Sequence, residues 1–253
     1  YMEDFYRAGG LPVVLHELRP LLHTHTSTVT GQTLGETLNP DYTYPTWQNV
    51  IHRLSEPLQN KGALVVLRGN LAPDGAILKR SAATPALLNS TGRAVVFASL
   101  RDLAERIDAP DLDVTPDDFL VLQNAGPIGG PGMPEAGYLP IPRKLTGVKD
   151  MVRISDARMS GTAFGTVVLH VSPEAAVGGP LALVRSGDRI EVSVDRRALR
   201  LLVDDAELAA RRAHWQPPYV EAARGYAHLY QQTVQQAHLG ADFDFLQHEA
   251  LRG

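Results

Sequence analysis

The chain has 253 residues, a formal net charge of −4 at pH 7 and no cysteine. This length allows one large or two small domains with a buried core. The weak negative charge gives no electrostatic basis for binding nucleic acid. No apolar run approaches the roughly 20 residues that cross a bilayer, so no membrane partner is expected. Without cysteine, the chain itself cannot form a disulfide or a cysteine-ligated zinc or iron–sulfur site.

The chain begins YMEDFYRAGG, without an initiator methionine and without a basic segment followed by an apolar one. No secretion signal is therefore expected, and the cytoplasm is the default compartment. The start also suggests a piece of a longer protein.

Residues 1–23 are predicted to be helical, because apolar residues recur at helical spacing on both sides of a Gly-Gly break. Residues 24–45 are rich in Thr, Gly, Asn and Pro, which indicates a long exposed connection. His23 and His25 lie at the start of this polar stretch. A metal site there is one reading, and solvated loop histidines are the favoured one.

From residue 63 onward the pattern changes to short apolar runs that are typical of strands. Predicted strands cover 63–67, 76–79, 93–97, 119–122, 151–154, 166–171, 181–184, 189–194 and 199–203. The first two are expected to pair around a Pro-Asp-Gly turn, and Asn70 and Asp74 are read as turn residues. His170 alternates with apolar residues and is expected to be a hydrogen-bonded core histidine. Helices are predicted over 99–107, 205–215 and 219–239.

Many short strands with interspersed helices predict an α/β fold in the form of a β-barrel flanked by helices. A regularly alternating, doubly wound sheet is not expected. Residues 1–45 are predicted to be a helix and extended connection that belong to a separate N-terminal domain. Residues 46–253 are predicted to form the C-terminal barrel domain.

The first segment that could carry chemistry is the glycine-rich run QNAGPIGGPGMPEAG, residues 123–137. Glycine allows backbone N–H groups to approach an anion or a metal-bound ligand closely. No Gly-Lys-Ser/Thr follows, so the run is not a P-loop. Glu135 is its only carboxylate, and a hard cation such as Mg²⁺ prefers carboxylate oxygens. The alternative is a tight turn with a solvated glutamate.

The second segment is SDARMSGTAFG, residues 155–165, where a predicted strand ends close to Ser160. A serine next to a glycine at a strand tip can project its hydroxyl into a cleft. That hydroxyl is a weak base until a charge, a metal or N–H donors stabilise the alkoxide. An ordinary turn serine is the alternative. Met159 and Arg158 do not fit the nucleophile elbow, and no His–Asp pair is evident, so a serine hydrolase is disfavoured.

Together these segments resemble the dihydroxy-acid dehydratase and phosphogluconate dehydratase family. The matching pieces are RGNLAPDGAILKRSA (68–82), GPIGGPGMPE (126–135), ISDARMSGTAFG (154–165) and HVSPEAAVGGPLALVRSGDRIEVSV (170–194). They cover most of the chain in the family's order. SDARMSG and TVVLHVSPEAA are most similar to the sugar-acid members, such as arabinonate and xylonate dehydratases.

The resemblance implies that the chain is the family's C-terminal domain, a barrel similar to the swivelling domain of aconitase. It places the cysteines of an iron–sulfur cluster, [2Fe-2S] or [4Fe-4S], in an N-terminal domain outside this chain. Most Mg²⁺ ligands, including a modified lysine, are expected there too. The implied partners are this cluster-binding domain, a small-molecule sugar acid and further copies of the protein in a homo-oligomer.

By the same resemblance, Glu135 would be a Mg²⁺ ligand and Ser160 the general base, acting as an alkoxide. Gly161 and Thr162 would lie close to the substrate. The implied activity is that of a hydro-lyase, which removes water from a 2,3-dihydroxy sugar acid to give a 2-keto-3-deoxy acid. The chain by itself is expected to be inactive. The alternatives are a dihydroxy-acid dehydratase of branched-chain amino-acid synthesis and a non-catalytic β-barrel binding module.

Overall fold

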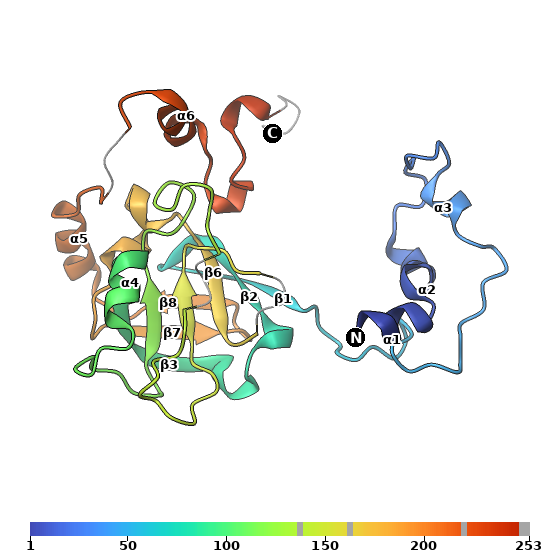
Figure 1. The fold of residues 1–253 in the computed structure, drawn as a ribbon, viewed down its shortest axis with the longest axis horizontal. Coiled ribbons are helices and arrows are strands. Elements are labelled where there is room, and N and C mark those ends of the chain that lie inside the picture. The colour runs from blue at the N-terminus through green and yellow to red at the C-terminus, as the bar shows by residue number, and fades with distance from the viewer. Residues whose placement is uncertain (136–138, 161–163, 219–221, 248–253) are drawn as a thin grey trace. The chain divides into compact units, whose positions relative to one another are not determined.

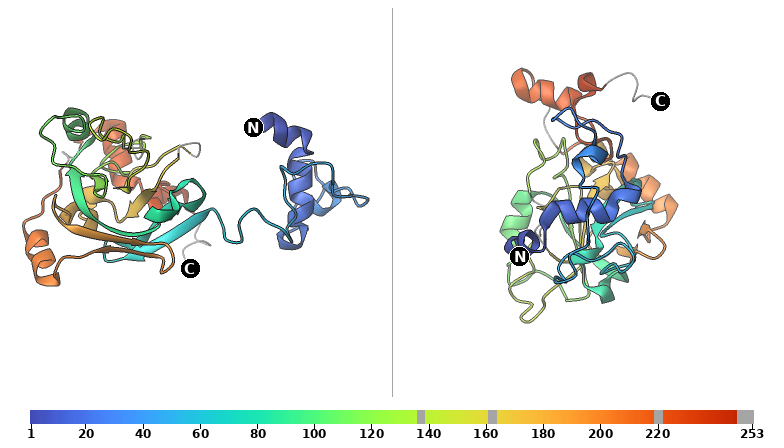
Figure 2. Two further views of the ribbon diagram at one scale, coloured as in Figure 1. Left: turned by 90° about the horizontal axis from the view of Figure 1, so that it is seen from below. Right: turned by 90° about the vertical axis from the view of Figure 1, so that its right-hand side faces the viewer.

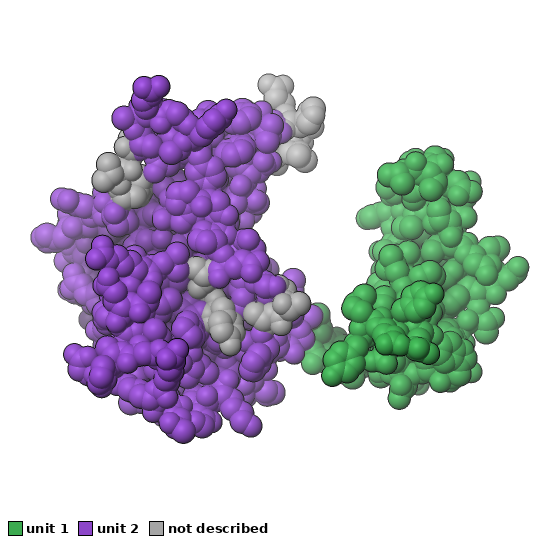
Figure 3. All heavy atoms as spheres, viewed as in Figure 1, with its two compact units in different colours: residues 1–62 green, residues 63–253 purple. Residues whose placement is uncertain are grey.

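The computed structural model describes residues 1–135, 139–160, 164–218 and 222–247. The chain divides into two compact units, residues 1–62 and residues 63–253, which Figure 3 shows in different colours. None of the helices in these described parts is both long and apolar enough to cross a membrane.

The N-terminal unit is built from short helices around a small apolar core. Its elements are α1 (Met2–Arg7), α2 (Gly10–Leu18), the 3-10 turn Arg19–Leu21 and α3 (Leu34–Thr37). The helical prediction for residues 1–23 is therefore confirmed. The break between α1 and α2 needs glycine, because Gly9 has a φ of +101° and a Cβ there would lie 2.5 Å from Val13 Cγ2.

The expected connection over 24–45 contains one helix, α3. A capping box starts it: the Glu36 amide donates to Thr33 Oγ1 at 3.3 Å, and the Thr33 amide donates to Glu36 Oε2 at 2.7 Å. His23 and His25 are both exposed, and their rings meet edge to face. Their exposure agrees with solvated loop histidines, which stays a prediction.

Residues 63–253 form a closed eight-stranded barrel with helices around it (Figures 1 and 2). The strands are β1 (Leu64–Gly69), β2 (Ala72–Lys79), β3 (Asn89–Phe97), β4 (Phe119–Leu122), β5 (Arg153–Ser155), β6 (Val167–Ser172), β7 (Arg189–Ser193) and β8 (Ala198–Leu201). Their order around the barrel is β1-β2-β6-β5-β4-β3-β7-β8. The helices are α4 (Leu100–Arg106), α5 (Asp205–Ala213) and α6 (Gly225–Thr233). The predicted α/β barrel with flanking helices is confirmed, and its likeness to the swivelling domain of aconitase stays a prediction.

Strands β3, β4, β5 and β6 run parallel to one another, and this determines where the candidate site lies. In register, Val121 of β4 pairs with Ile154 of β5, and Ile154 pairs with Val168 of β6. The carboxyl ends of β4, β5 and β6 therefore meet at one end of the barrel. The segments that follow these three strands must start side by side there.

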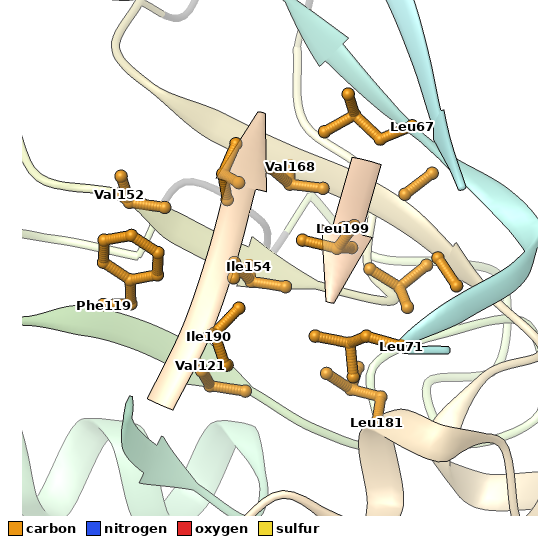
Figure 4. Packing of buried hydrophobic residues seen from close by; sticks show 14 of the residues in the cluster. Leu67, Leu71, Phe119, Val121, Val152, Ile154, Val168, Leu181, Ile190 and Leu199 are labelled. Atoms are coloured by element: carbon orange, nitrogen blue, oxygen red, sulfur yellow. The ribbon is translucent and has the colours of Figure 1, made fainter. Parts of the chain in front are cut away.

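Alternate residues of β4 serve two different cores. Phe119 and Val121 point into the barrel, among the apolar side chains drawn in Figure 4. Leu120 and Leu122 pack in a second cluster outside the barrel, which also contains Leu103 of α4. Burial on both faces explains why this strand is an uninterrupted apolar run, FLVL, rather than an alternating one.

One predicted strand is wrong. Leu181–Val184 was expected to be a strand, but Pro180–Leu183 forms a 3-10 turn. Proline at its start has no N–H to contribute to a ladder. The carbonyl groups of Leu181 and Val184 accept hydrogen bonds from Gln123 Nε2 at 2.7 and 3.0 Å. A buried glutamine thus takes the place of a neighbouring strand.

The β1–β2 hairpin forms as expected, but its turn does not lie at Pro-Asp-Gly. That tripeptide is inside β2, where the register shifts next to Gly75, and the chain reverses at Asn70 and Leu71. The Asn70 amide nitrogen donates to the Leu201 carbonyl at 2.8 Å, and its oxygen accepts from the Leu201 amide at 2.8 Å. Asn70 is a turn residue as predicted, and it also joins the hairpin to β8.

His170 was expected in the core, and this is wrong. The side chain is half-buried and lines an outer groove of about 450 Å³ between the β1–β2 hairpin and residues 237–240. The residue has a φ of +54°, which rotates it out of the regular strand alternation. Burial, and then the charge of Arg158, lower the pKa of His170.

Substitution of two leucines in β1 tests which face of this strand packs into the barrel core. Leu67→Ala should lower the free energy of unfolding by about 2–5 kcal/mol, because its side chain is fully buried in the barrel core. Leu64→Ala in the same strand should change it by less than about 1 kcal/mol, because Leu64 is 64% exposed. Urea unfolding followed by circular dichroism measures both, and equal losses would contradict this assignment of the two faces.

Candidate functional site

Three segments begin at the end of the barrel where β4, β5 and β6 terminate. We call residues 123–135 the glycine-rich loop, residues 156–165 the serine loop and residues 173–177 the acidic turn. Each follows one of three adjacent parallel strands. Loops that follow parallel strands at one edge commonly form ligand sites, so this end of the barrel is the candidate active site.

Asp156 connects the three segments. It follows β5, the middle strand, and is completely buried. One carboxylate oxygen accepts from the Ala125 amide in the glycine-rich loop at 2.9 Å, and the other accepts from the Ala175 amide in the acidic turn at 2.9 Å. Burial raises the pKa of Asp156 to about 7, while the two amide donors act in the opposite direction.

Glu174 of the acidic turn lies directly under the glycine-rich loop and is 1% exposed. Its Oε2 accepts from the Gly129 amide at 2.9 Å, and its Oε1 accepts from the Ile128 amide at 3.0 Å. Gly126 must be glycine here, because a Cβ at that position would lie 2.7 Å from Glu174 Oε2. Successive amides around a carboxylate form an anion-binding nest.

This arrangement corrects one expectation about the glycine-rich loop. Its N–H groups were expected to approach an external anion or a metal-bound ligand. The amides of Ile128 and Gly129 instead bind the chain's own carboxylate, Glu174. The glycines in this part of the loop therefore serve an internal contact, and the loop's remaining candidate for ligand binding is Glu135.

Arg158 joins the serine loop to the far end of the glycine-rich loop. Its Nε donates to the Met133 carbonyl at 2.6 Å, and its Nη1 donates to Glu135 Oε1 at 2.7 Å. The Glu135 side chain is 51% exposed. Ser160, two residues beyond Arg158, is half-buried. The Glu135 side chain therefore contacts Arg158 of the serine loop, the loop that also carries Ser160. Gly161 and Thr162 lie outside the described residues.

The end of the serine loop, where the chain enters β6, is fixed by a buried ion pair. Arg153 is 2% exposed and pairs with Asp150 at 2.8 Å. Asp150 also accepts from the Thr166 amide at 3.0 Å. Although burial acts to raise it, hydrogen bonds from Thr84 and Thr166 and the Arg153 charge lower the pKa of Asp150. The last residue of the loop, Gly165, has to be glycine, because a Cβ there would lie 1.8 Å from Arg153 Nη2.

The donor set of the described residues at the site fits one metal ligand, Glu135. The described residues include no group of three side chains that could hold a metal ion. Glu135 is a single, half-exposed carboxylate whose Oε1 bonds to Arg158, and its second oxygen can still bind a cation. The sequence has no cysteine for a cluster. Within the described residues, Glu135 is therefore the candidate that a metal site completed by other groups could use.

Sequence reasoning missed the residues that position the loops. Asp156 was seen only as an acid at a strand end, and Glu174 only as part of a matching segment. Each is a carboxylate close behind a buried strand of a parallel pair, and that signal could have identified both. Tyr230, whose hydroxyl bonds to the glycine-rich loop, lies 95 or more residues away in sequence and gave no such signal.

Asp156 should make stability depend on pH in a known direction. Its pKa is raised from 3.8 to about 7 in the fold, so the folded state binds more protons than the unfolded state between these values. The stability that this group contributes is present below about pH 4 and is lost as the pH rises toward 7. Relative to Asp156→Asn, the wild-type free energy of unfolding should fall by on the order of 1 kcal/mol or more over this range.

Urea unfolding at a series of pH values measures this difference, in which other titrating groups cancel. Asp205→Asn is the matched control, because Asp205 is exposed at the start of α5. A difference between wild type and Asp156→Asn that does not change with pH would contradict the buried, proton-binding state of Asp156.

The sequence matches two models of one protein family. Residues 49–241 match the model of the dihydroxy-acid/6-phosphogluconate dehydratase C-terminal domain, and residues 1–37 match that of the N-terminal domain. The chain is 51% identical to the L-arabinonate dehydratase of Rhizobium leguminosarum bv. trifolii over 249 residues, which is 97% of this chain.

Two other relatives widen the range of substrates in the family. The 6-deoxy-6-sulfo-D-gluconate dehydratase of Pseudomonas putida is 50% identical over 97% of this chain, and the dihydroxy-acid dehydratase of Syntrophobacter fumaroxidans is 42% identical over 95% of it. The chain spans 43% of the length of each of these three relatives. From the match over most of its length, we conclude that the chain belongs to the dihydroxy-acid/6-phosphogluconate dehydratase family.

Proposed function

We propose that this chain is the C-terminal part of a hydro-lyase that removes water from a 2,3-dihydroxy sugar acid to give a 2-keto-3-deoxy acid. The ion pair between Arg158 and Glu135 is the observation that supports this most directly. It joins the loop with the candidate metal ligand to the loop with the candidate base. A sugar acid is favoured over a branched-chain precursor, because the sugar-acid relatives cited above are 50–51% identical and the dihydroxy-acid relative 42%.

In this proposal Ser160 acts on the substrate as the general base. Its alkoxide removes the proton at C2, and the hydroxyl at C3 leaves as water once it has gained a proton. The enol that results rearranges to the keto acid, so that one water is lost and no oxidant or reductant is needed. Gly161 and Thr162 are proposed to contact the substrate beside Ser160.

We further propose that the full-length protein holds Mg²⁺, with Glu135 as one ligand, and an iron–sulfur cluster whose cysteines lie outside this chain. When bound, Mg²⁺ would acidify the C2 proton through the substrate's carboxylate and C2 hydroxyl, and a cluster iron would act as a Lewis acid toward the C3 hydroxyl. In this chain, the hydrogen bond from Arg158 would orient the Glu135 carboxylate toward the metal.

A serine hydroxyl is far too weakly acidic to lose its proton unaided near pH 7. The nearest cation on the serine loop, Arg158, is already bonded to Met133 and Glu135. The charge that stabilises the alkoxide is therefore proposed to come from the N-terminal cluster-binding domain. The proposal accordingly includes that domain as a partner, a homo-oligomer of the full-length protein in the cytoplasm, and no activity for this chain alone.

A dihydroxy-acid dehydratase of branched-chain amino-acid synthesis is the second candidate. It is supported by the relative from Syntrophobacter fumaroxidans, which is 42% identical. A panel of pentonates, hexonates and 2,3-dihydroxy-3-methylbutanoate, tested on full-length enzyme, separates the two. Higher kcat/KM for the branched acid than for any sugar acid would reject the sugar-acid proposal.

Ser160→Ala in the full-length enzyme should lower kcat by about 10²–10⁴-fold, the usual contribution of a positioned general base. The cluster's visible absorption spectrum should not change, because this chain supplies no cluster ligand. Ser90→Ala is the matched control, since Ser90 is also half-buried but lies at the start of β3, away from the loops. Unchanged turnover in Ser160→Ala would remove Ser160 from the mechanism and favour a non-catalytic barrel.

Glu135→Gln in the full-length enzyme should raise the Mg²⁺ concentration for half-maximal activity by about tenfold or more, because a carboxylate ligand is lost. Glu105→Gln is the control, because Glu105 is also an exposed glutamate paired with an arginine, Arg101. The readout is a Mg²⁺ titration of the initial rate. The same titration curve for both variants would show that Glu135 is only a turn residue.

A further inference from the structure

The C-terminal segment, residues 225–247, reaches across to the glycine-rich loop. The Tyr230 hydroxyl donates to the Pro127 carbonyl at 2.9 Å and accepts from the Gly132 amide at 2.9 Å. One side chain thus joins two points of the loop that are five residues apart. Figure 1 shows α6, which carries Tyr230, at the end of the barrel where the loop after β4 lies.

A second residue of the same segment supports the other half of the loop. Gln236 Nε2 donates to Glu174 Oε1 at 2.7 Å, and Gln236 Oε1 accepts from the Glu174 amide at 2.8 Å. Glu174 in turn holds the amides of Ile128 and Gly129. The C-terminal segment therefore contacts the loop directly through Tyr230 and indirectly through Gln236 and the buried Glu174.

Contacts within the C-terminal segment fix the position of Tyr230. Val234 and Phe243 form a β-bridge, and the Gln235 amide donates to the Asp242 carbonyl at 2.8 Å. The Tyr230 ring packs edge to face against Phe243 at 5.9 Å between centroids. Both the ring and the hydroxyl of Tyr230 are thus fixed by neighbours.

The part of the loop next to Glu135 contains one open position, although Met133 is buried and its amide donates to the Gly130 carbonyl at 2.8 Å. Gly132 has a φ of +81°, and a Cβ there would meet no atom within 4 Å. The Tyr230 hydroxyl is bound to the amide of this open position, three residues before Glu135. From the other side, Arg158 binds the Met133 carbonyl and the Glu135 carboxylate.

We propose that Tyr230 is a positioning residue that sets the divalent-metal affinity of Glu135 by fixing the loop in front of it. This rests on the proposed role of Glu135 as a metal ligand. Both hydrogen bonds of the Tyr230 hydroxyl are made to backbone, so Tyr230 acts through the loop and not by touching the metal. A ligand held in place pays less ordering entropy when the cation binds, which raises affinity.

The test uses full-length enzyme with Tyr230→Phe, which keeps the ring against Phe243 and removes only the hydroxyl. Tyr226→Phe is the matched control, because Tyr226 is on the same helix and 92% exposed. Metal affinity is measured as the Mg²⁺ dependence of the rate and, independently of activity, as Mn²⁺ binding by electron paramagnetic resonance. Hydrogen exchange at the Gly132 amide reports on the loop without any metal.

Tyr230→Phe should weaken Mg²⁺ and Mn²⁺ binding by about tenfold, speed up exchange at Gly132, and leave kcat at saturating Mg²⁺ within about twofold. Tyr226→Phe should change none of these. In a Glu135→Gln background, Tyr230→Phe should have no further effect on metal binding, because its effect passes through that carboxylate.

Three results would overturn the inference in different ways. If Glu135→Gln weakens metal binding but Tyr230→Phe does not, the positioning role is wrong and the ligand assignment stands. If Tyr230→Phe weakens metal binding equally with and without Glu135, Tyr230 acts by another route. If Glu135→Gln itself changes nothing, the ligand assignment fails and the inference fails with it.

Discussion

Two carboxylates buried at the ends of parallel strands hold the candidate site in shape. A buried carboxylate is costly to desolvate unless hydrogen-bond donors replace the lost water. For Asp156 and Glu174, backbone amides of the neighbouring loops supply those donors. Each acid is stable only while the loops stay where they are, and the loops keep their amides satisfied only while the acids stay buried.

The two halves of the glycine-rich loop are held by different groups. The first half of the glycine-rich loop is bound from beneath by Asp156 and Glu174. The second half, which leads to Glu135, is held by one hydrogen bond from Gly132 to Tyr230 and by two from Arg158, to Met133 and Glu135. A loop built in this way has one firmly placed part and one part whose position depends on individual hydrogen bonds. The candidate ligand lies in the second part.

Two arginines next to the candidate site are already paired within this chain. Arg158 is bonded to Glu135 and Met133, and Arg153 is bonded to Asp150, so both cations already serve the loops. Nothing in the described residues forms a three-ligand metal site. The chain spans 43% of the length of the relatives cited above, so the proposed reaction includes groups from the rest of the protein.

Local sequence patterns predicted the barrel well, because most strands are short apolar runs between turn residues. They failed where a distant residue decides the local structure. Leu181–Val184 has the composition of a strand, but its carbonyls are bound by Gln123, nearly 60 residues earlier. His170 alternates with core residues in sequence, yet its positive φ turns it into an outer groove.

The roles of the selected site residues stay a prediction, but the structure shows how two of the loops that carry them are joined. Glu135 and Ser160 were selected from their motifs, and the contact of Arg158 with Glu135 joins the two loops that carry them. The acids beneath the loops were missed, because a lone Asp or Glu in sequence is most often exposed. Only the parallel register of β4, β5 and β6 shows that these carboxylates must lie under neighbouring loops.

The most direct test is a crystal structure of the full-length enzyme with Mg²⁺ and a slowly reacting 2,3-dihydroxy acid. We expect a Glu135 oxygen at about 2.0–2.1 Å from the metal. We also expect the Ser160 hydroxyl oxygen within about 3.5 Å of C2 of the same bound acid. A structure in which the carboxylate and the hydroxyl face different cavities would contradict this expectation.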